Sequence, residues 1–259
     1  MYGLKTNLMK GKSKMTDHME LLRARPKLLY SRDHKLVVLF SPKSACTFVT
    51  KWFFFQLGLL DEALQYHEWI HEYRIHRFYK NAWYERFLHA ILEQDYKTVK
   101  ITRNPFSRAV SSYIVYLQQP GHAECTFEDF IEWLRTIDIE NYFDTHFTIQ
   151  SHKLEIHDVL KPDYCFDMLE SMEKLREVEN ELGLVNANFH ELRKSRHNTV
   201  REQETGYCGN KLMNKRSSFP EYHHFYNDEM EQAVLDIYRI DFEMYGYPKK
   251  LQPEGGEKP

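Results

Sequence analysis

The stretch that decides the fold is residues 35–52, KLVVLFSPKSACTFVTKW. It opens with a short apolar run, breaks into small and polar residues from Ser41 to Thr47, and then resumes with apolar residues at helical spacing. A short apolar run bounded by turn residues predicts a buried strand, and the resumed pattern predicts a helix. The stretch therefore predicts a strand, a phosphate-binding loop and a helix in succession.

The loop in this stretch has the residues that an anion site needs. Backbone N–H groups at a helix N-terminus attract anions, and Lys43 adds a mobile positive charge. Ser44 and Ala45 are small enough for close backbone approach, and Thr47 can donate its hydroxyl or cap the helix. The pattern G-x-x-x-x-G-K-[ST] is absent, which disfavours an ordinary ATP or GTP loop. A solvated turn with a spare lysine is the simpler alternative.

A second element, RNPFSRAVSSY, begins at Arg103 after a strand predicted over residues 98–102. Ligands gather at the carboxyl ends of strands in open α/β sheets, and the guanidinium fork of Arg103 suits phosphate. Pro105 fits the first turn of a helix, on which Arg108 and Ser111 share one face. Arg108 alone is equally explained by a structural salt bridge. Two anion sites on one sheet predict a doubly phosphorylated nucleotide as ligand.

These two motifs resemble those of sulfotransferases that use 3′-phosphoadenosine 5′-phosphosulfate (PAPS), and most closely the carbohydrate branch, sulfotransferase family 2. The first motif, a Pro-Lys followed by two small residues and Cys-Thr, is met at Pro42, Lys43, Ser44, Ala45, Cys46 and Thr47. The second motif is met at Arg103, Pro105, Phe106, Arg108, Ser111 and Tyr113.

Three later segments extend the resemblance over nearly the whole chain. They are His146-Phe147-x-x-Gln150, the run PDYCFD at residues 162–167, and Tyr238-x-x-Asp241-Phe242-x-x-Tyr245-Gly246-Tyr247. Two positions depart from the family pattern: Ile149 stands where many relatives have proline, and Ser107 stands where an acidic residue is frequent. The departures leave the donor motifs intact and concern the acceptor side.

The resemblance implies a fold, a donor and roles for the motif residues. The fold would be α/β, a P-loop-type three-layer architecture with a mainly parallel central sheet flanked by helices, and the alternation of strands and helices agrees with it. PAPS would be the co-substrate and 3′-phosphoadenosine 5′-phosphate (PAP) the product, with no metal. Lys43 would stabilise the bridging oxygen, Thr47 and the loop amides the 5′-phosphate, and Arg103 with Ser111 the 3′-phosphate. The acceptor would be a hydroxyl, expected to belong to a sugar or glycan.

The general base is expected among the 14 histidines. His71 lies between the two donor motifs, where a family branch keeps its catalytic histidine, and Glu68 or Glu72 could orient it. His146 lies in a segment that resembles the family's acceptor side. A satisfied surface or core histidine is the alternative for each. His67 and His71, four residues apart, also fit a zinc pair, but the sequence places no third ligand.

Composition and length predict one catalytic domain. The 259 residues contain no low-complexity linker or repeat, so we expect an N-terminal extension over 1–30, a single domain over 31–250 and a flexible tail over 251–259. A net charge of −3 argues against a nucleic-acid partner. No apolar run or signal core predicts stable membrane insertion, so a cytoplasmic enzyme of bacterial type is expected over a Golgi enzyme without its anchor.

The four cysteines are widely spaced, which predicts neither a zinc site nor a disulfide framework. Cys46 is expected to fill space in the loop rather than act as a nucleophile. Elsewhere, residues 68–92 read as helical, and residues 164–168 as a strand. Thr126 and Ser171 are expected to cap helices, the second ending at Gly183. A helical stripe near the C-terminus comprises Met230, Ala233, Val234, Ile237 and Tyr238. Residues 188–226 predict a lid or substrate loop.

Two other function classes fit parts of this pattern. A nucleotide-binding interaction protein could keep the donor site without turnover, and it would bind PAP tightly but transfer nothing. A small-molecule kinase of the P-loop type would consume ATP in the presence of magnesium. The aromatic content of 15% supplies stacking faces for sugar rings, although it serves a hydrophobic core equally well.

Overall fold

The computed structural model describes residues 17–122, 124–194, 206–214 and 216–251. The chain divides into two units. Unit 1 comprises Met1–Ser41, Ala45–Ile101 and His152–Lys194, and unit 2 comprises Pro42–Ser44, Thr102–Ser151 and Ser195–Pro259. Residues 1–16 of the predicted extension and nearly all of the predicted tail lie outside the described residues. The single catalytic domain over 31–250 stays a prediction.

Unit 1 is built on a four-stranded sheet in the order β1-β2-β3-β5. Its strands are β1 (Leu29–Ser31), β2 (Leu36–Leu39), β3 (Lys97–Thr102) and β5 (Tyr164–Asp167). β2 and β3 are parallel, with Val38 opposite Val99. β1 pairs antiparallel with β2, because a connection of only a few residues allows a hairpin and no parallel crossover. The predicted α/β fold with a mainly parallel sheet flanked by helices is confirmed.

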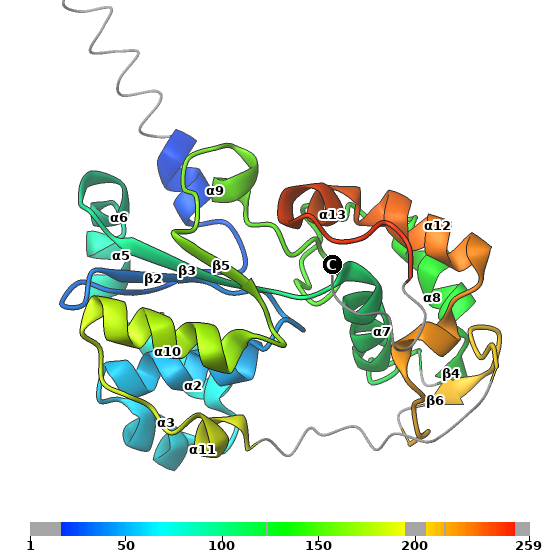
Figure 1. The fold of residues 1–259 in the computed structure, drawn as a ribbon, viewed down its shortest axis with the longest axis horizontal. Helices are drawn as coiled ribbons and strands as arrows, with labels where there is room; N and C mark the ends of the chain where they lie inside the picture. Colours follow the sequence, from blue (N-terminus) through cyan, green and yellow to red (C-terminus); the bar gives the residue numbers. More distant parts are fainter. Residues whose placement is uncertain (1–16, 123, 195–205, 215, 252–259) are drawn as a thin grey trace, which may run out of the picture. The chain divides into compact units, whose positions relative to one another are not determined.

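Helices cover the sheet of unit 1, and α2 and α10 lie along one side of it (Figure 1). Residues 17–22 are helical, and the α-helices that follow β1 in this unit are α2 (Cys46–Gln56), α3 (Leu60–Tyr66), α4 (Ile70–Tyr73), α5 (Ala82–Phe87), α6 (Ala90–Glu93), α9 (Lys153–Ile156), α10 (Ser171–Leu182) and α11 (Phe189–Arg193). A π-helical turn, η1 (Arg74–Phe78), continues α4. The predicted helical character of residues 68–92 is confirmed in pieces, because the chain restarts at Asn81, whose side chain caps α5.

Unit 2 is mainly helical. Its helices are α7 (Pro105–Tyr116), α8 (Phe127–Leu134), the 3₁₀ turn η2 (Tyr222–Phe225), α12 (Asp228–Ile237) and α13 (Arg239–Tyr245), and its short strands β4 (Glu124–Cys125) and β6 (Met213–Asn214) pair antiparallel. Aromatic rings form much of its interior. The ring centroids of Phe106 and Phe242, on α7 and α13, lie 4.8 Å apart. None of the helices within the described residues is long and apolar enough to cross a membrane.

Local capping signals account for several helix ends. Thr126 forms the predicted cap of α8: its hydroxyl oxygen accepts from the Asp129 N–H, and the Asp129 carboxylate accepts from the Thr126 N–H. Gly183 ends α10 in the left-handed conformation, as predicted. The cap predicted at Ser171 is wrong: Glu170 is the N-cap residue, and the Ser171 hydroxyl donates backwards to the Met168 carbonyl. The predicted loop over 188–226 contains α11 and η2, and its residues 195–205 and 215 lie outside the described residues.

Candidate functional site

The predicted phosphate loop contains two residues in a backbone conformation that side chains usually avoid. Lys43 has φ 68° and Ala45 has φ 55°, both in the left-handed region. For residues other than glycine this conformation costs about 1–2 kcal/mol, and it concentrates at ligand sites. α2 begins at Cys46 with Ala45 as its N-cap residue, so Thr47 lies in the first turn and is not the cap. The loop thus leads directly into a helix N-terminus.

Three successive loop residues are held by side chains of unit 2. The Pro42 carbonyl accepts a hydrogen bond from Arg108 Nε at 3.2 Å. The Lys43 carbonyl accepts one from Arg103 Nη1 at 3.0 Å. The Ser44 hydroxyl donates to Gln150 Oε1 at 3.1 Å. These bonds bring Lys43, from the first motif, and Arg103, from the second, into direct contact.

Arg103 lies immediately after β3, at the carboxyl end predicted for it. Its Nε donates to the Ser107 hydroxyl at 2.7 Å, and Ser107 lies one helical turn before Ser111 on α7. Residues four apart share a helix face, so the guanidinium of Arg103 lies over the face that carries Ser111. Asn104 caps this helix and Pro105 occupies its first turn. Arg103 thus contacts α7 one turn before Ser111, the other residue predicted to hold the 3′-phosphate.

Arg108 is buried, with 1% of its surface exposed. Its Nη1 and Nη2 are buried without a hydrogen-bond partner among the described residues. Its positive charge acts on Asp241: burial raises the pKa of this carboxyl, and Arg108 lowers it in part. The salt bridge considered for Arg108 is thus not formed in the described part of the chain. Arg108 instead supports the Pro42 carbonyl.

His71, in unit 1, lies against the beginning of α2. Its Nε2 is 3.2 Å from Thr47 Oγ1 and 3.7 Å from Cys46 Sγ, and the residue is 5% exposed. The ring of Trp69 meets the His71 ring edge-on, with centroids 5.3 Å apart. Glu72, one of the two predicted orienting residues, pairs with His76. His71 is therefore next to two residues of the predicted phosphate loop.

His146 belongs to unit 2 and is paired with a carboxylate. Its Nδ1 lies 2.7 Å from Asp144 Oδ1, and its backbone carbonyl accepts a hydrogen bond from Ser112 on α7. Burial alone would raise the pKa of Asp144, but hydrogen bonds from His146 and Gln119 hold it below its ordinary value. The imidazole side chain is 38% exposed. This geometry is that of an oriented histidine.

The zinc pair considered for His67 and His71 gains no third ligand. The Nδ1 of His67 accepts a hydrogen bond from the Trp69 backbone N–H at 2.9 Å. Among the residues that the structure describes, no group of three histidine, cysteine or acidic side chains could hold a metal ion.

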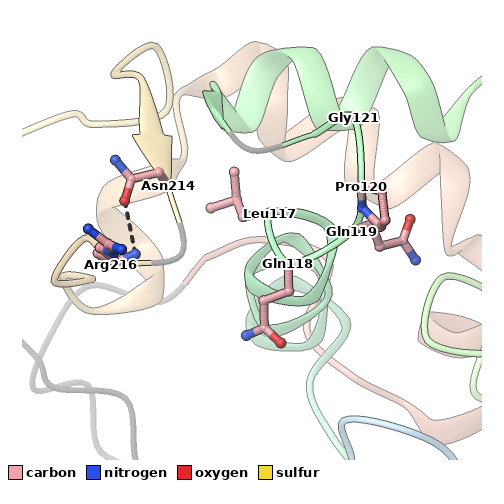
Figure 2. Close-up of a pocket in the computed structure, with 7 residues that line it drawn as sticks. All are labelled: Leu117, Gln118, Gln119, Pro120, Gly121, Asn214 and Arg216. Atoms are coloured by element: carbon pink, nitrogen blue, oxygen red, sulfur yellow. Dashed lines mark hydrogen bonds between the residues drawn. The ribbon is translucent and has the colours of Figure 1, made fainter.

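A surface pocket of about 510 Å³ lies in unit 2 (Figure 2). The segment after α7 forms one wall and the residues beside β6 form the other; its lining comprises Leu117, Gln118, Gln119, Pro120, Gly121, Asn214 and Arg216. A backbone bond from Arg216 to the Asn214 side chain shapes the second wall. None of the donor-motif residues lines it.

Two residues at the site were not predicted to act there. Gln150 contacts both motifs, and Asp241 on α13 binds the backbone of Gln150. Both occur in segments that carry the family resemblance, which was the available signal. A neutral amide has no chemistry of its own that marks it as functional, and the approach of Asp241 depends on tertiary structure.

Comparison with known proteins gives one match. A family model described as Sulfotransferase family matches residues 26–248, which include both motifs and all the candidate site residues. No curated protein and no solved structure matches the chain.

Proposed function

Because this chain belongs to the sulfotransferase family, we propose that it moves a sulfuryl group from PAPS to the hydroxyl of a carbohydrate acceptor. The family membership covers most of the chain and supports sulfuryl transfer in general. The donor and the acceptor class are parts of the proposal. It rests above all on the contact between the phosphate loop and Arg103.

That contact supports a donor with phosphate groups at both ends. Residues Pro42 to Thr47 form a loop with a helix N-terminus behind it, which suits the 5′-phosphosulfate. Arg103 contacts Ser107, one turn before Ser111 on α7, and we assign Arg103 and Ser111 to the 3′-phosphate. The Lys43 carbonyl accepts a hydrogen bond from Arg103. A change in the loop conformation would therefore also move the residue assigned to the 3′-phosphate.

In the transfer step the acceptor oxygen attacks sulfur and the bond from sulfur to the 5′-phosphate oxygen breaks. The departing PAP gains negative charge on that oxygen, and the acceptor hydroxyl loses its proton to a base. Lys43 is placed by sequence to neutralise the developing charge, which is usually the largest catalytic term. Cys46 packs beside His71 and needs no covalent role in this step.

His71 is the first candidate for the base, because its Nε2 lies 3.2 Å from the hydroxyl of Thr47, a residue of the phosphosulfate loop. His146 is the second candidate, because its pairing with Asp144 is the arrangement that orients a general base. Both assignments can be tested with one acceptor.

The acceptor proposal is supported by aromatic rings beside His71. Trp69 is 38% exposed and its ring lies next to the His71 ring, and Tyr66 is 47% exposed nearby in sequence. Exposed aromatic faces are suited to amphipathic ligands, and a sugar ring has both apolar and polar edges. A hydroxyl held against Trp69 would lie within reach of the candidate base.

The test is a transfer assay with PAPS labelled in the sulfuryl group and a panel of glycans, lipids and small alcohols. We expect label to enter a sugar hydroxyl, with one PAP released for each sulfate transferred and transfer slowed by about a hundredfold or more in Lys43→Ala. Tight PAP binding without transfer to any acceptor would instead support a binding protein. Magnesium-dependent consumption of ATP would support a kinase.

A further inference from the structure

Gln150 is buried beside the end of β3, with 1% of its surface exposed. Its side-chain amide brackets the backbone of Arg103: Oε1 accepts from the Arg103 N–H at 2.9 Å, and Nε2 donates to the Arg103 carbonyl at 2.8 Å. The same Oε1 accepts from the Ser44 hydroxyl. One amide thereby fixes a residue of each donor motif.

Gln150 is itself held by a buried carboxylate. Asp241 on α13 is fully buried, and its two oxygens accept from the Gln150 backbone N–H at 3.0 and 2.9 Å. Asp241 Oδ1 also accepts from the Ser151 N–H at 3.0 Å and from the Ser151 hydroxyl at 2.8 Å. These bonds fix the peptide group from which the Gln150 side chain extends.

A carboxylate in this place has a physical cost that a neutral residue would avoid. Removing it from water raises the pKa of Asp241, while the charge of Arg108 and then hydrogen bonds from Gln150 and Ser151 oppose that shift in part. Hydrogen bonds to a charged acceptor are shorter and stronger than neutral ones. We therefore expect the buried Asp241 carboxylate to make the backbone at Gln150 rigid rather than to raise the free energy of unfolding.

From these contacts we propose that Gln150 is a positioning residue for the 3′-phosphate end of the donor and that Asp241 is its anchor. This rests on the proposed function, which takes Arg103 as a phosphate ligand. The amide of Gln150 bonds protein groups and acts through Arg103, because the backbone of Arg103 sets where its guanidinium can reach. A misplacement of about 1 Å can cost up to a hundredfold at a site of this kind.

The experiment compares two ligands that differ only in the 3′-phosphate, PAP and adenosine 5′-monophosphate (AMP), by titration calorimetry on Gln150→Ala. The matched control is Gln56→Ala. Gln56 is also buried, and its amide brackets Val185 in the same way, with bonds of 2.8 and 3.0 Å, but it is the last residue of α2, at the end opposite to the phosphate loop.

We expect Gln150→Ala to weaken PAP about tenfold or more while AMP affinity changes less than about threefold. Gln56→Ala should lower the melting temperature but leave the ratio of the two affinities at the wild-type value. Equal losses for both ligands in Gln150→Ala, or no loss for PAP, would overturn the positioning role. A wild-type protein without any preference for PAP over AMP would instead contradict the proposed donor, before any variant is measured.

Two conservative variants keep the proposal testable if Gln150→Ala does not fold. Gln150→Glu retains an acceptor for the Arg103 N–H and loses the donor to the Arg103 carbonyl. Asp241→Asn retains the shape of the anchor and loses its charge. Both variants should reduce the ratio of PAP affinity to AMP affinity. Glu179→Gln, which changes a buried carboxylate of unit 1, should leave this ratio unchanged. An unchanged ratio in both site variants would refute the proposal.

Discussion

At the scale of single residues, Lys43 combines a constrained backbone with a charge in the phosphate loop. Its left-handed φ of 68° is held by the bond between its carbonyl and Arg103. A lysine constrained at its backbone still has a long side chain that can follow a departing group. The backbone of Lys43 thus helps to fix the loop, while its side chain can neutralise charge.

We therefore predict that Lys43→Ala lowers kcat by about a hundredfold or more, the effect of losing one donor to transition-state charge. PAP affinity should fall much less, because Arg103 and the loop amides remain. Steady-state kinetics and calorimetry measure the two effects. Lys51→Ala is the control, because Lys51 lies on α2 and its ammonium donates to the Lys194 carbonyl, so this lysine serves a structural contact. A loss of PAP affinity as large as the loss of kcat would make Lys43 a binding residue.

The two candidate bases give the second prediction. Replacement of the true base by Ala should lower the rate at neutral pH by about a hundredfold to ten-thousandfold without changing PAP affinity. We expect this for His71, and a smaller effect, mainly on acceptor KM, for His146. The same acceptor serves both variants. Near-normal kcat in both would turn attention to Glu68, because the lowered pKa of Asp144 makes it a weak base.

At the scale of elements, α2 and α10 are joined through one buried carboxylate. Glu179 on α10 is fully buried. Its Oε1 accepts from Trp52 Nε1 at 2.9 Å, from Gln56 Nε2 at 3.1 Å and from the Ala187 N–H at 3.1 Å. Arg176 donates to its Oε2 at 2.7 Å. The helix that begins at the phosphate loop is thus fastened near its other end.

Glu179→Ala should lower the free energy of unfolding by about 3 kcal/mol or more, because it leaves several buried donors without acceptors. Urea denaturation gives the value. Glu177→Ala is the control on the same helix: Glu177 is exposed and pairs with Lys174, so its loss should stay within about 0.5 kcal/mol. Equal effects of the two variants would contradict the role of Glu179 as the fastening point.

A pH dependence is predicted at the beginning of α9. Burial, and then the charge of Lys100, lower the pKa of His152 from 6.5 to about 4. Between pH 6.5 and 4, His152 is protonated in the unfolded chain but neutral in the folded one. The free energy of unfolding therefore falls as the pH decreases from 6.5 toward 4. His152 Nδ1 caps α9 by accepting from the Leu154 N–H, and Asn can replace that acceptor.

His152→Asn should therefore remove part of the acid destabilisation, on the order of 3 kcal/mol between neutral pH and pH 4. Urea denaturation of both proteins across this pH range gives the difference between their free energies of unfolding. Other titrating groups contribute equally to both proteins and cancel in that difference. Parallel stability curves for the wild type and the variant would mean that His152 does not titrate in this way.

The sequence predicted the elements whose causes are local. The break at Ser41 to Thr47 marked a strand, a loop and a helix, and Thr126 marked a helix start, because each depends on neighbours in the chain. The contact of Gln150 with Arg103 joins residues 47 positions apart and could not be predicted. Ser171 failed as a cap because the preceding turn offered its hydroxyl another acceptor.

At the scale of the whole molecule, donor binding should stabilise the folded chain by mass action. At a PAP concentration about a hundred times its Kd, the gain is about 2.7 kcal/mol, which corresponds to a rise of about 5–10 °C in Tm. AMP at the same concentration should give a smaller rise, because it does not engage Arg103 and Ser111. Thermal scans with both ligands test this. Equal rises would contradict the predicted 3′-phosphate site.

The bond between Asp241 and Gln150 also has a consequence for the order in which the protein is made. The two residues are 91 positions apart, so a chain leaving the ribosome presents both donor motifs and Gln150 long before α13 exists. Until Asp241 emerges, the Gln150 peptide lacks its acceptor and the side chain that brackets Arg103 is unsupported. Competence to bind the donor would therefore arise only after α13 has been synthesised.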